Sequence, residues 1–272
     1  MKEYISPQNG IYYRVNDFKP QRQTLVFIHG LIGSSSTWFR YEKRFENEFN
    51  ILTFDLRGHG MSKKYPKEQD YTIKNFSKDI YELINELSIK RFVLITHSFG
   101  TSVALEFLRE HANLVTSAIF FNPVYKKKML PLFIFFVSWL MPLAQLLPPR
   151  KGGHVDYSQF INTGDFNMRR IFADIFNTTL PIYIYCLKQI AQNQDSNIWT
   201  KFSLPVFVVH GKKDKISPVA NGMKIAQMIP GAKVEILENA NHLTIFNNFD
   251  EVSEAIERFV SRSRPSAKNA SR

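Results

Sequence analysis

Cysteine is almost absent from this chain of 272 residues, with Cys186 as its single instance. One cysteine cannot form an internal disulfide, so the sequence carries no mark of an oxidising compartment. The first seven residues, Met1 to Pro7, also lack the apolar core of a secretion signal. We therefore expect a cytoplasmic protein, either soluble or held peripherally at a membrane.

Metal-ligand and nucleic-acid signatures are lacking as well. Neither His111 nor His154 has a partner at metal-ligand spacing, so we expect no metal, and no motif suggests a cofactor. The 35 basic and 24 acidic residues leave a net charge of +11, which favours anionic surfaces. Basic residues gather at Lys126–Lys128 and between Arg258 and Arg272, with no basic stripe interleaved with aromatics. Nucleic acid is therefore not an expected partner.

Short apolar runs alternate with helical patterns along most of the chain. Eight runs are predicted as strands, at residues 4–5, 11–15, 25–28, 51–54, 92–95, 117–121, 205–209 and 233–237. Amphipathic helices are predicted at 71–87 and 250–260. Runs that are apolar throughout are typical of strands buried on both faces of a parallel sheet. The sequence therefore predicts an α/β fold with a mostly parallel eight-stranded sheet flanked by helices.

The segment from Arg91 to His111 carries the strongest chemical signal. Phe92 to Ile95 is predicted as a buried strand, and residues 101–111 have helical spacing, so Ser98 lies where a strand becomes a helix. A serine there has its hydroxyl lifted out of the sheet edge, and the N–H groups beside it face outward at a helix N-terminus that favours negative charge. This placement suits a nucleophile.

The pentad Thr96-His97-Ser98-Phe99-Gly100 is close to the Gly-x-Ser-x-Gly nucleophile elbow of the α/β-hydrolases, with Thr96 in place of the first glycine. Alone, the pentad favours catalysis no more than a structural turn. Two further segments resemble the same family. His29 to Gly33 is a His-Gly loop after the third strand, and Asp55 to Ser62 matches the family's Asp-x-Arg-Gly-x-Gly-x-Ser loop. We interpret the second loop as architectural and His59 within it as structural.

The resemblance implies a full set of catalytic groups. Asp214 stands in a Gly-x-x-Asp segment after the seventh strand, where the family's triad acid lies, and His242 follows the eighth strand on a loop. The order Ser98, Asp214, His242 is the family's order. Asn122-Pro123 ends the sixth strand without a carboxylate, so the acid must come from the seventh. The backbone N–H groups of Leu31 and Phe99 are the implied oxyanion hole.

The strand-helix rhythm stops between residues 124 and 201, which is longer than an ordinary connection. We predict a helical cap (lid) there, a core formed by 1–123 and 202–262, and a disordered basic tail at 263–272. The apolar run 129–147 is broken by Pro131 and Pro142, which disfavours a membrane span. Two readings stay open for it: short helices above an apolar pocket, or peripheral docking of residues 126–151 on anionic lipid.

A helix is also predicted from Asp165 to Phe176, with Asp165 as its N-cap and its aromatics in the core. The functional hypothesis is a serine hydrolase that cleaves carboxylic esters of apolar, lipid-like or medium-chain acyl groups through an acyl-enzyme. Two alternatives remain at this point: a carbon–carbon bond hydrolase of ring-cleavage diketo acids, which uses the same triad, and a non-catalytic ligand-binding protein on the same fold.

Overall fold

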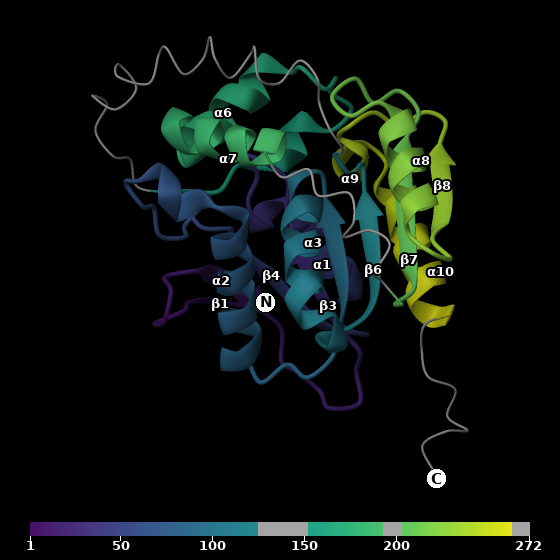
Figure 1. The fold of residues 1–272 in the computed structure, drawn as a ribbon, viewed down its shortest axis with the longest axis horizontal. Helices are drawn as coiled ribbons and strands as arrows, with labels where there is room; N and C mark the ends of the chain where they lie inside the picture. The colour runs from purple at the N-terminus through teal and green to yellow at the C-terminus, as the bar shows by residue number, and fades with distance from the viewer. Residues whose placement is uncertain (125–151, 193–202, 263–272) are drawn as a thin grey trace.

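An eight-stranded sheet forms the centre of this computed structural model, which describes residues 1–124, 152–192 and 203–262 (Figure 1). Its strands lie in the order β1-β2-β4-β3-β5-β6-β7-β8, in which the pairs β1–β2 and β2–β4 are antiparallel and every pair from β4 to β8 is parallel. The predicted sheet is confirmed. The strands are β1 (Lys2–Ile5), β2 (Tyr12–Val15), β3 (Thr24–Ile28), β4 (Asn50–Phe54), β5 (Phe92–His97), β6 (Val115–Phe121), β7 (Val206–Gly211) and β8 (Lys233–Leu237).

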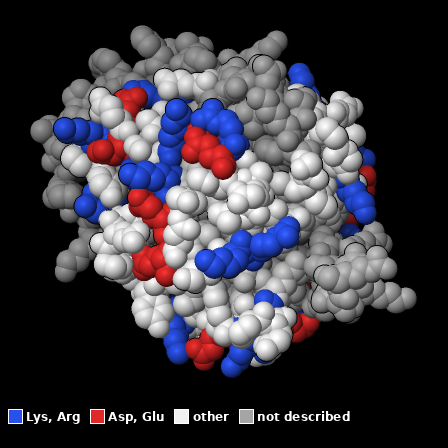
Figure 2. Space-filling view, turned by 60° about the horizontal axis from the view of Figure 1, so that its bottom comes forward, with Lys and Arg blue, Asp and Glu red and all other residues white. Residues whose placement is uncertain are grey.

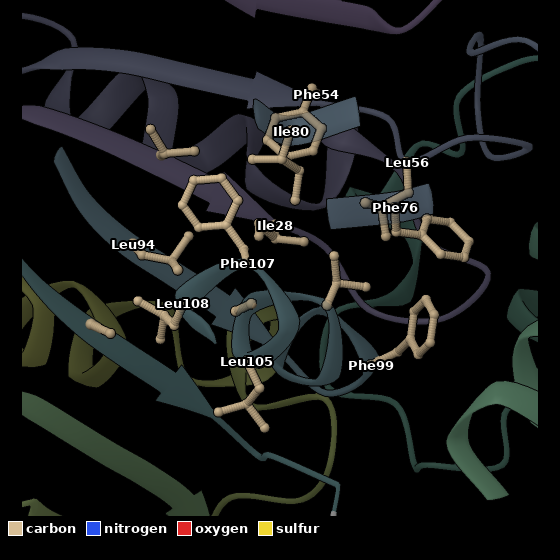
Figure 3. Close-up of a cluster of buried hydrophobic side chains, with 14 of the residues drawn as sticks. Ile28, Phe54, Leu56, Phe76, Ile80, Leu94, Phe99, Leu105, Phe107 and Leu108 are labelled. Carbon is tan, nitrogen blue, oxygen red and sulfur yellow. The ribbon is translucent and has the colours of Figure 1, made fainter. Parts of the chain in front are cut away.

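The central strands are buried on both faces because helices cover both. Along β3, Val26 and Ile28 face one apolar cluster while Leu25 and Phe27 face another, as the two-residue period of a strand requires. Figure 3 shows Ile28 and Leu94 of the first cluster close to Phe107 of α3. The helices around the sheet are α1 (Phe39–Phe45), α2 (Ile73–Glu86), α3 (Phe99–His111), α8 (Val219–Met228), α9 (Thr244–Asn247) and α10 (Phe249–Arg262).

The two predicted flanking helices are present, with shifted ends. A short 3₁₀ helix, Glu68–Tyr71, precedes α2, and Thr72 caps α2 by accepting a hydrogen bond from the N–H of Asn75. The closing helix α10 begins one residue earlier and ends two residues later than predicted. These differences lie at helix ends, where sequence patterns are least informative.

The insertion between β6 and β7 contributes a 3₁₀ helix (Tyr157–Phe160), α6 (Met168–Thr178) and α7 (Leu180–Gln192) among the described residues. Figure 1 shows α6 and α7 lying across the end of the sheet where the parallel strands finish. The predicted N-cap was wrong. Helix α6 is capped by Asn167, whose side chain accepts from the N–H of Arg170, and Asp165 has other partners described below.

Helix α6 presents its apolar side outward, contrary to the prediction that its aromatics are core. Met168, Phe172 and Phe176 are 55%, 64% and 59% exposed. The inner side is polar instead: Asp174 is buried and accepts hydrogen bonds from Arg170 and from the phenol of Tyr157. This network takes the place that the aromatic side chains would otherwise fill.

The apolar run 129–147 lies outside the described residues. Within the described ranges, no helix is long and apolar enough to cross a membrane. On the face seen in Figure 2, Lys and Arg side chains lie interspersed with Asp and Glu and form no continuous basic area. The same ranges contain no group of histidine, cysteine and carboxylate side chains that could hold a metal ion.

Candidate active site

Ser98 occupies the turn between β5 and α3, as predicted. Its backbone has φ 51° and ψ −117°, a conformation that a residue other than glycine rarely adopts. Its N–H donates to the carbonyl of Phe121 at the end of β6, which holds the turn against the sheet. Such strain persists only where surrounding contacts over-determine it, and it is found most often at functional sites.

Small side chains allow the strand and the helix to meet at this turn. A β-carbon on Gly100 would lie 2.7 Å from the carbonyl oxygen of His29, closer than real contacts permit. Thr96, which replaces the usual first glycine, has its hydroxyl 2.8 Å from that of Thr101. The larger residue is therefore accommodated by a hydrogen bond to the first turn of α3.

The three residues predicted as a triad lie together. His242 Nε2 is 2.9 Å from Ser98 Oγ, and His242 Nδ1 is 2.7 Å from Asp214 Oδ2. All three side chains are at least nine-tenths buried. Because Nδ1–H donates to a carboxylate, Nε2 carries the lone pair and accepts the proton of the serine hydroxyl.

Asp214 is the anionic end of this chain of hydrogen bonds. Its Oδ1 accepts from the backbone N–H groups of Ile216 and Ser217, at 2.8 and 2.7 Å. Burial raises the pKa of the Asp214 carboxyl, but hydrogen bonds from His210 and His242 outweigh it and hold that pKa well below its usual range. Asp214 is therefore ionised near neutral pH.

Asn122 makes a contact with the triad that its sequence position did not reveal. Its amide donates to Asp214 Oδ2 at 2.8 Å and to the carbonyl of Asn241 at 3.2 Å. The side chain is fully buried, and the backbone has a φ of 46°, a left-handed value that asparagine tolerates. The end of β6, which lacks a carboxylate, thus supplies a hydrogen-bond donor to Asp214, the acid that follows β7.

His97 is a second residue that sequence reasoning missed. Its Nε2 donates to the carbonyl of His242 at 2.9 Å, which fixes the backbone that carries the base. Burial, with a smaller contribution from the charge of His242, lowers the pKa of His97 to about 3. His97 is therefore neutral near neutral pH. Its position beside Ser98 in the sequence is the one signal that could have suggested it.

The predicted oxyanion donors are the backbone N–H groups of Leu31 and Phe99. Phe99 is the first residue of α3, directly after Ser98. A β-carbon on Gly30 would lie 3.3 Å from that of Ser98, so the loop that carries Leu31 runs against the nucleophile. The assignment of the Leu31 and Phe99 N–H groups to an oxyanion hole stays a prediction.

The Asp55 loop is tied down by its own side chains. Asp55 accepts from the N–H groups of Ser35 and Met61, both at 2.7 Å, and Arg57 forms a two-pronged ion pair with Asp79 of α2. His154 of the insertion, which has no partner at metal-ligand spacing in the sequence, donates to Asp55 at 2.8 Å. The loop thus joins the sheet, α2 and the insertion.

A serine, a histidine and an aspartate joined by hydrogen bonds at the carboxyl ends of parallel strands define the arrangement found in α/β-hydrolases. Residues 23–249 match the family described as alpha/beta hydrolase fold. The chain belongs to this family. Its sequence identity to the individual proteins described next is 25% or less, over most of the chain.

An uncharacterized protein of Mycobacterium tuberculosis is 25% identical over 263 residues, covering 89% of this chain and 76% of the relative. A probable lysophospholipase of Arabidopsis thaliana, BODYGUARD 2, is 22% identical; 84% of this chain matches 56% of that protein, so the chain spans about half its length. A thermophilic esterase from Thermogutta terrifontis has a similar structure, with a TM-score of 0.74 and 19% identity over 97% of this chain and all of the esterase.

Proposed function

We propose that the protein is a serine hydrolase that cleaves carboxylic esters, with Ser98 as nucleophile, His242 as general base and acid, and Asp214 as the group that orients His242. The observation that carries this proposal is the unbroken line of hydrogen bonds from Ser98 Oγ through the imidazole to Asp214. A serine hydroxyl is a weak nucleophile until a base takes its proton.

The reaction follows from these positions. Ser98 Oγ attacks the ester carbonyl carbon while its proton passes to His242 Nε2, and the carboxylate of Asp214 stabilises the resulting imidazolium. The N–H groups of Leu31 and Phe99 hold the oxyanion of the tetrahedral intermediate. Collapse of that intermediate breaks the carbon–oxygen bond, and the leaving alkoxide takes the proton from Nε2. Water then attacks the acyl carbon while His242 Nε2 takes its proton. Collapse of this second tetrahedral intermediate releases the carboxylic acid and returns the proton to Ser98 Oγ.

Several observations support an apolar acyl group. Among the described residues, α6 and α7 lie over the end of the sheet that carries Ser98 (Figure 1). We propose that the insertion of residues 124–201 acts as a cap on the core of 1–123 and 202–262. Its sequence is rich in apolar residues and contains no Glu to hold a substrate ammonium. The names of two similar proteins, a thermophilic esterase and a probable lysophospholipase, agree with cleavage of a carboxylic ester.

The test is hydrolysis of a panel of esters with different acyl chain lengths, in which release of the alcohol is measured over time. We expect a burst of alcohol equal to the enzyme concentration. Ser98→Ala should abolish turnover, whereas Ser102→Ala, at a half-buried position on α3, should retain it. Turnover that survives Ser98→Ala refutes the proposal. Hydrolysis of vinylogous diketo acids in preference to esters would instead indicate the carbon–carbon bond hydrolase.

We further propose peripheral contact with a lipid surface. The sequence-based site for it, 126–151, lies outside the described residues, but the exposed Met168, Phe172 and Phe176 of α6 support the same idea. Co-sedimentation with anionic vesicles at low salt should fall several-fold in a Phe172→Ser, Phe176→Ser double variant and not in Met223→Ser, which alters an exposed residue of α8. Equal sedimentation of all three proteins would contradict this contact.

A further inference from the structure

The carboxylate of Asp165 lies between the two loops that carry the acid and the base. Its Oδ1 accepts the backbone N–H of His242 at 2.8 Å, and its Oδ2 accepts the backbone N–H of Lys215, the residue after Asp214, also at 2.8 Å. The side chain is 4% exposed. One residue of the insertion therefore bridges the backbones of both loops.

Neighbouring residues hold Asp165 in this position. Asn241 and Asn247 both donate from their side-chain amides to the carbonyl of Thr163, at 2.9 Å. On the other side, Arg170 of α6 donates to the carbonyl of Asp165 at 3.2 Å. The segment 163–165 is thus fixed to Asn241, which directly precedes His242, and to Asn247 at the end of α9.

The backbone of His242 is consequently held at both ends of the residue. Its N–H is bound by Asp165 and its carbonyl by His97 Nε2, at 2.8 and 2.9 Å. Hydrogen bonds to an ionised carboxylate are about twice as strong as those between neutral groups. Fixing both peptide groups restricts the orientation of the Cα–Cβ bond of His242. It therefore also restricts the distances from the imidazole nitrogens to Ser98 and Asp214.

We propose that Asp165 is a positioning residue through which the insertion sets the geometry between the base and the acid. The kinetic part of this inference rests on the proposed function. Both hydrogen bonds of the Asp165 carboxylate described above go to backbone N–H groups and neither goes to Ser98 or to the imidazole ring, so its effect passes through the backbone of His242 and of Lys215. A misplacement of about 1 Å at a reacting group is enough to cost about 10²-fold in rate.

The kinetic experiment compares Asp165→Ala and Asp165→Asn with Asp156→Ala in the full-length protein. Asp156 is a suitable control because it also belongs to the insertion, but within the part of the chain that the structure describes its carboxylate accepts only from the nearby Ser158 and Gln159. We expect kcat to fall about 10²-fold in Asp165→Ala with KM changed less than about threefold, a smaller fall in Asp165→Asn, and no change in Asp156→Ala. If both Asp165 variants keep the kcat of Asp156→Ala, the proposal is wrong.

A second measurement does not depend on catalysis. The Nδ1–H proton of His242 donates to Asp214, so it gives a downfield NMR resonance protected from exchange with water. In folded Asp165→Asn, this resonance should shift and broaden, whereas Asp156→Ala should leave it unchanged. An unaltered resonance in Asp165→Asn overturns the positioning role even if no ester is hydrolysed. A wild-type protein that lacks turnover but shows the expected NMR difference would refute the proposed function and leave this inference standing.

Discussion

Replacing Asn122 by aspartate turns a hydrogen-bond donor of the acid into a second carboxylate. The amide nitrogen of Asn122 lies 2.8 Å from Asp214 Oδ2, and the side chain is fully buried. Two unit charges about 4 Å apart repel by about 4 kcal/mol at an effective dielectric constant near 20. At 1.36 kcal/mol per pKa unit, this raises the pKa of the new carboxyl by about three units, from about 3.9 toward neutrality.

The sign of the effect on stability follows from this raised pKa. Stability from a group with a raised pKa in the folded state is complete below its unfolded pKa and is lost as the pH rises through its folded pKa. The free energy of unfolding of Asn122→Asp should therefore fall by about 4 kcal/mol between pH 4 and pH 8, relative to Asn122→Gly. Glycine is the suitable reference because it removes the amide and tolerates the φ of 46°.

Urea unfolding at several pH values measures this difference. The contribution of Asp214 itself, which is lost as the pH falls because its pKa is lowered, is present in both variants and largely cancels. An equal pH dependence of the two variants would mean that the side chain at position 122 does not face Asp214, and would refute this description of the acid's surroundings.

Two further predictions concern the insertion and the nucleophile turn. Burial raises the pKa of Asp174 to about 7 in spite of Arg170 and Tyr157. The stability of the wild type relative to Asp174→Asn, measured by urea unfolding, should therefore decline by at most about 4 kcal/mol as the pH rises from 4 to 8. The buried histidines, whose lowered pKa values give the opposite trend, are present in both proteins and cancel in this difference. Gly100→Ala should lower stability by about 1–3 kcal/mol in thermal unfolding and reduce ester turnover, because the new β-carbon meets backbone oxygens of β3 and its loop. Gly164→Ala, whose β-carbon meets nothing within 4 Å, is the control for the stability measurement.

The sheet was predictable because its signals are local. Each central strand is a short run of apolar residues bounded by turn residues, and burial on both faces requires that composition whatever the neighbouring strand is. The elbow was predictable for a similar reason, since Ser98 and Gly100 report a backbone turn that few residues tolerate. Asp214 and His242 were identified by their places after β7 and β8 in a known family order.

What the sequence did not reveal depends on partners far along the chain. The outward side of α6 follows from the buried contacts of Arg170, Asp174 and Tyr157, which outweigh the expected burial of Phe172. Asp165 resembled an N-cap because it stands before a helical pattern, but its acceptors are used by backbone groups 50 and 77 residues away. The spacing of apolar residues predicts that a helix forms but not which part of the protein each of its sides contacts.

The most direct test of the account is the site at which a fluorophosphonate probe reacts, identified by mass spectrometry of the labelled peptides. We expect one label per chain on Ser98 and no label in Ser98→Ala. The labelling rate should be lower by several powers of ten in His242→Ala, because that variant lacks the base that takes the serine proton. A label on another residue, or labelling at the wild-type rate in His242→Ala, would contradict the claim that Ser98 is a nucleophile activated by His242.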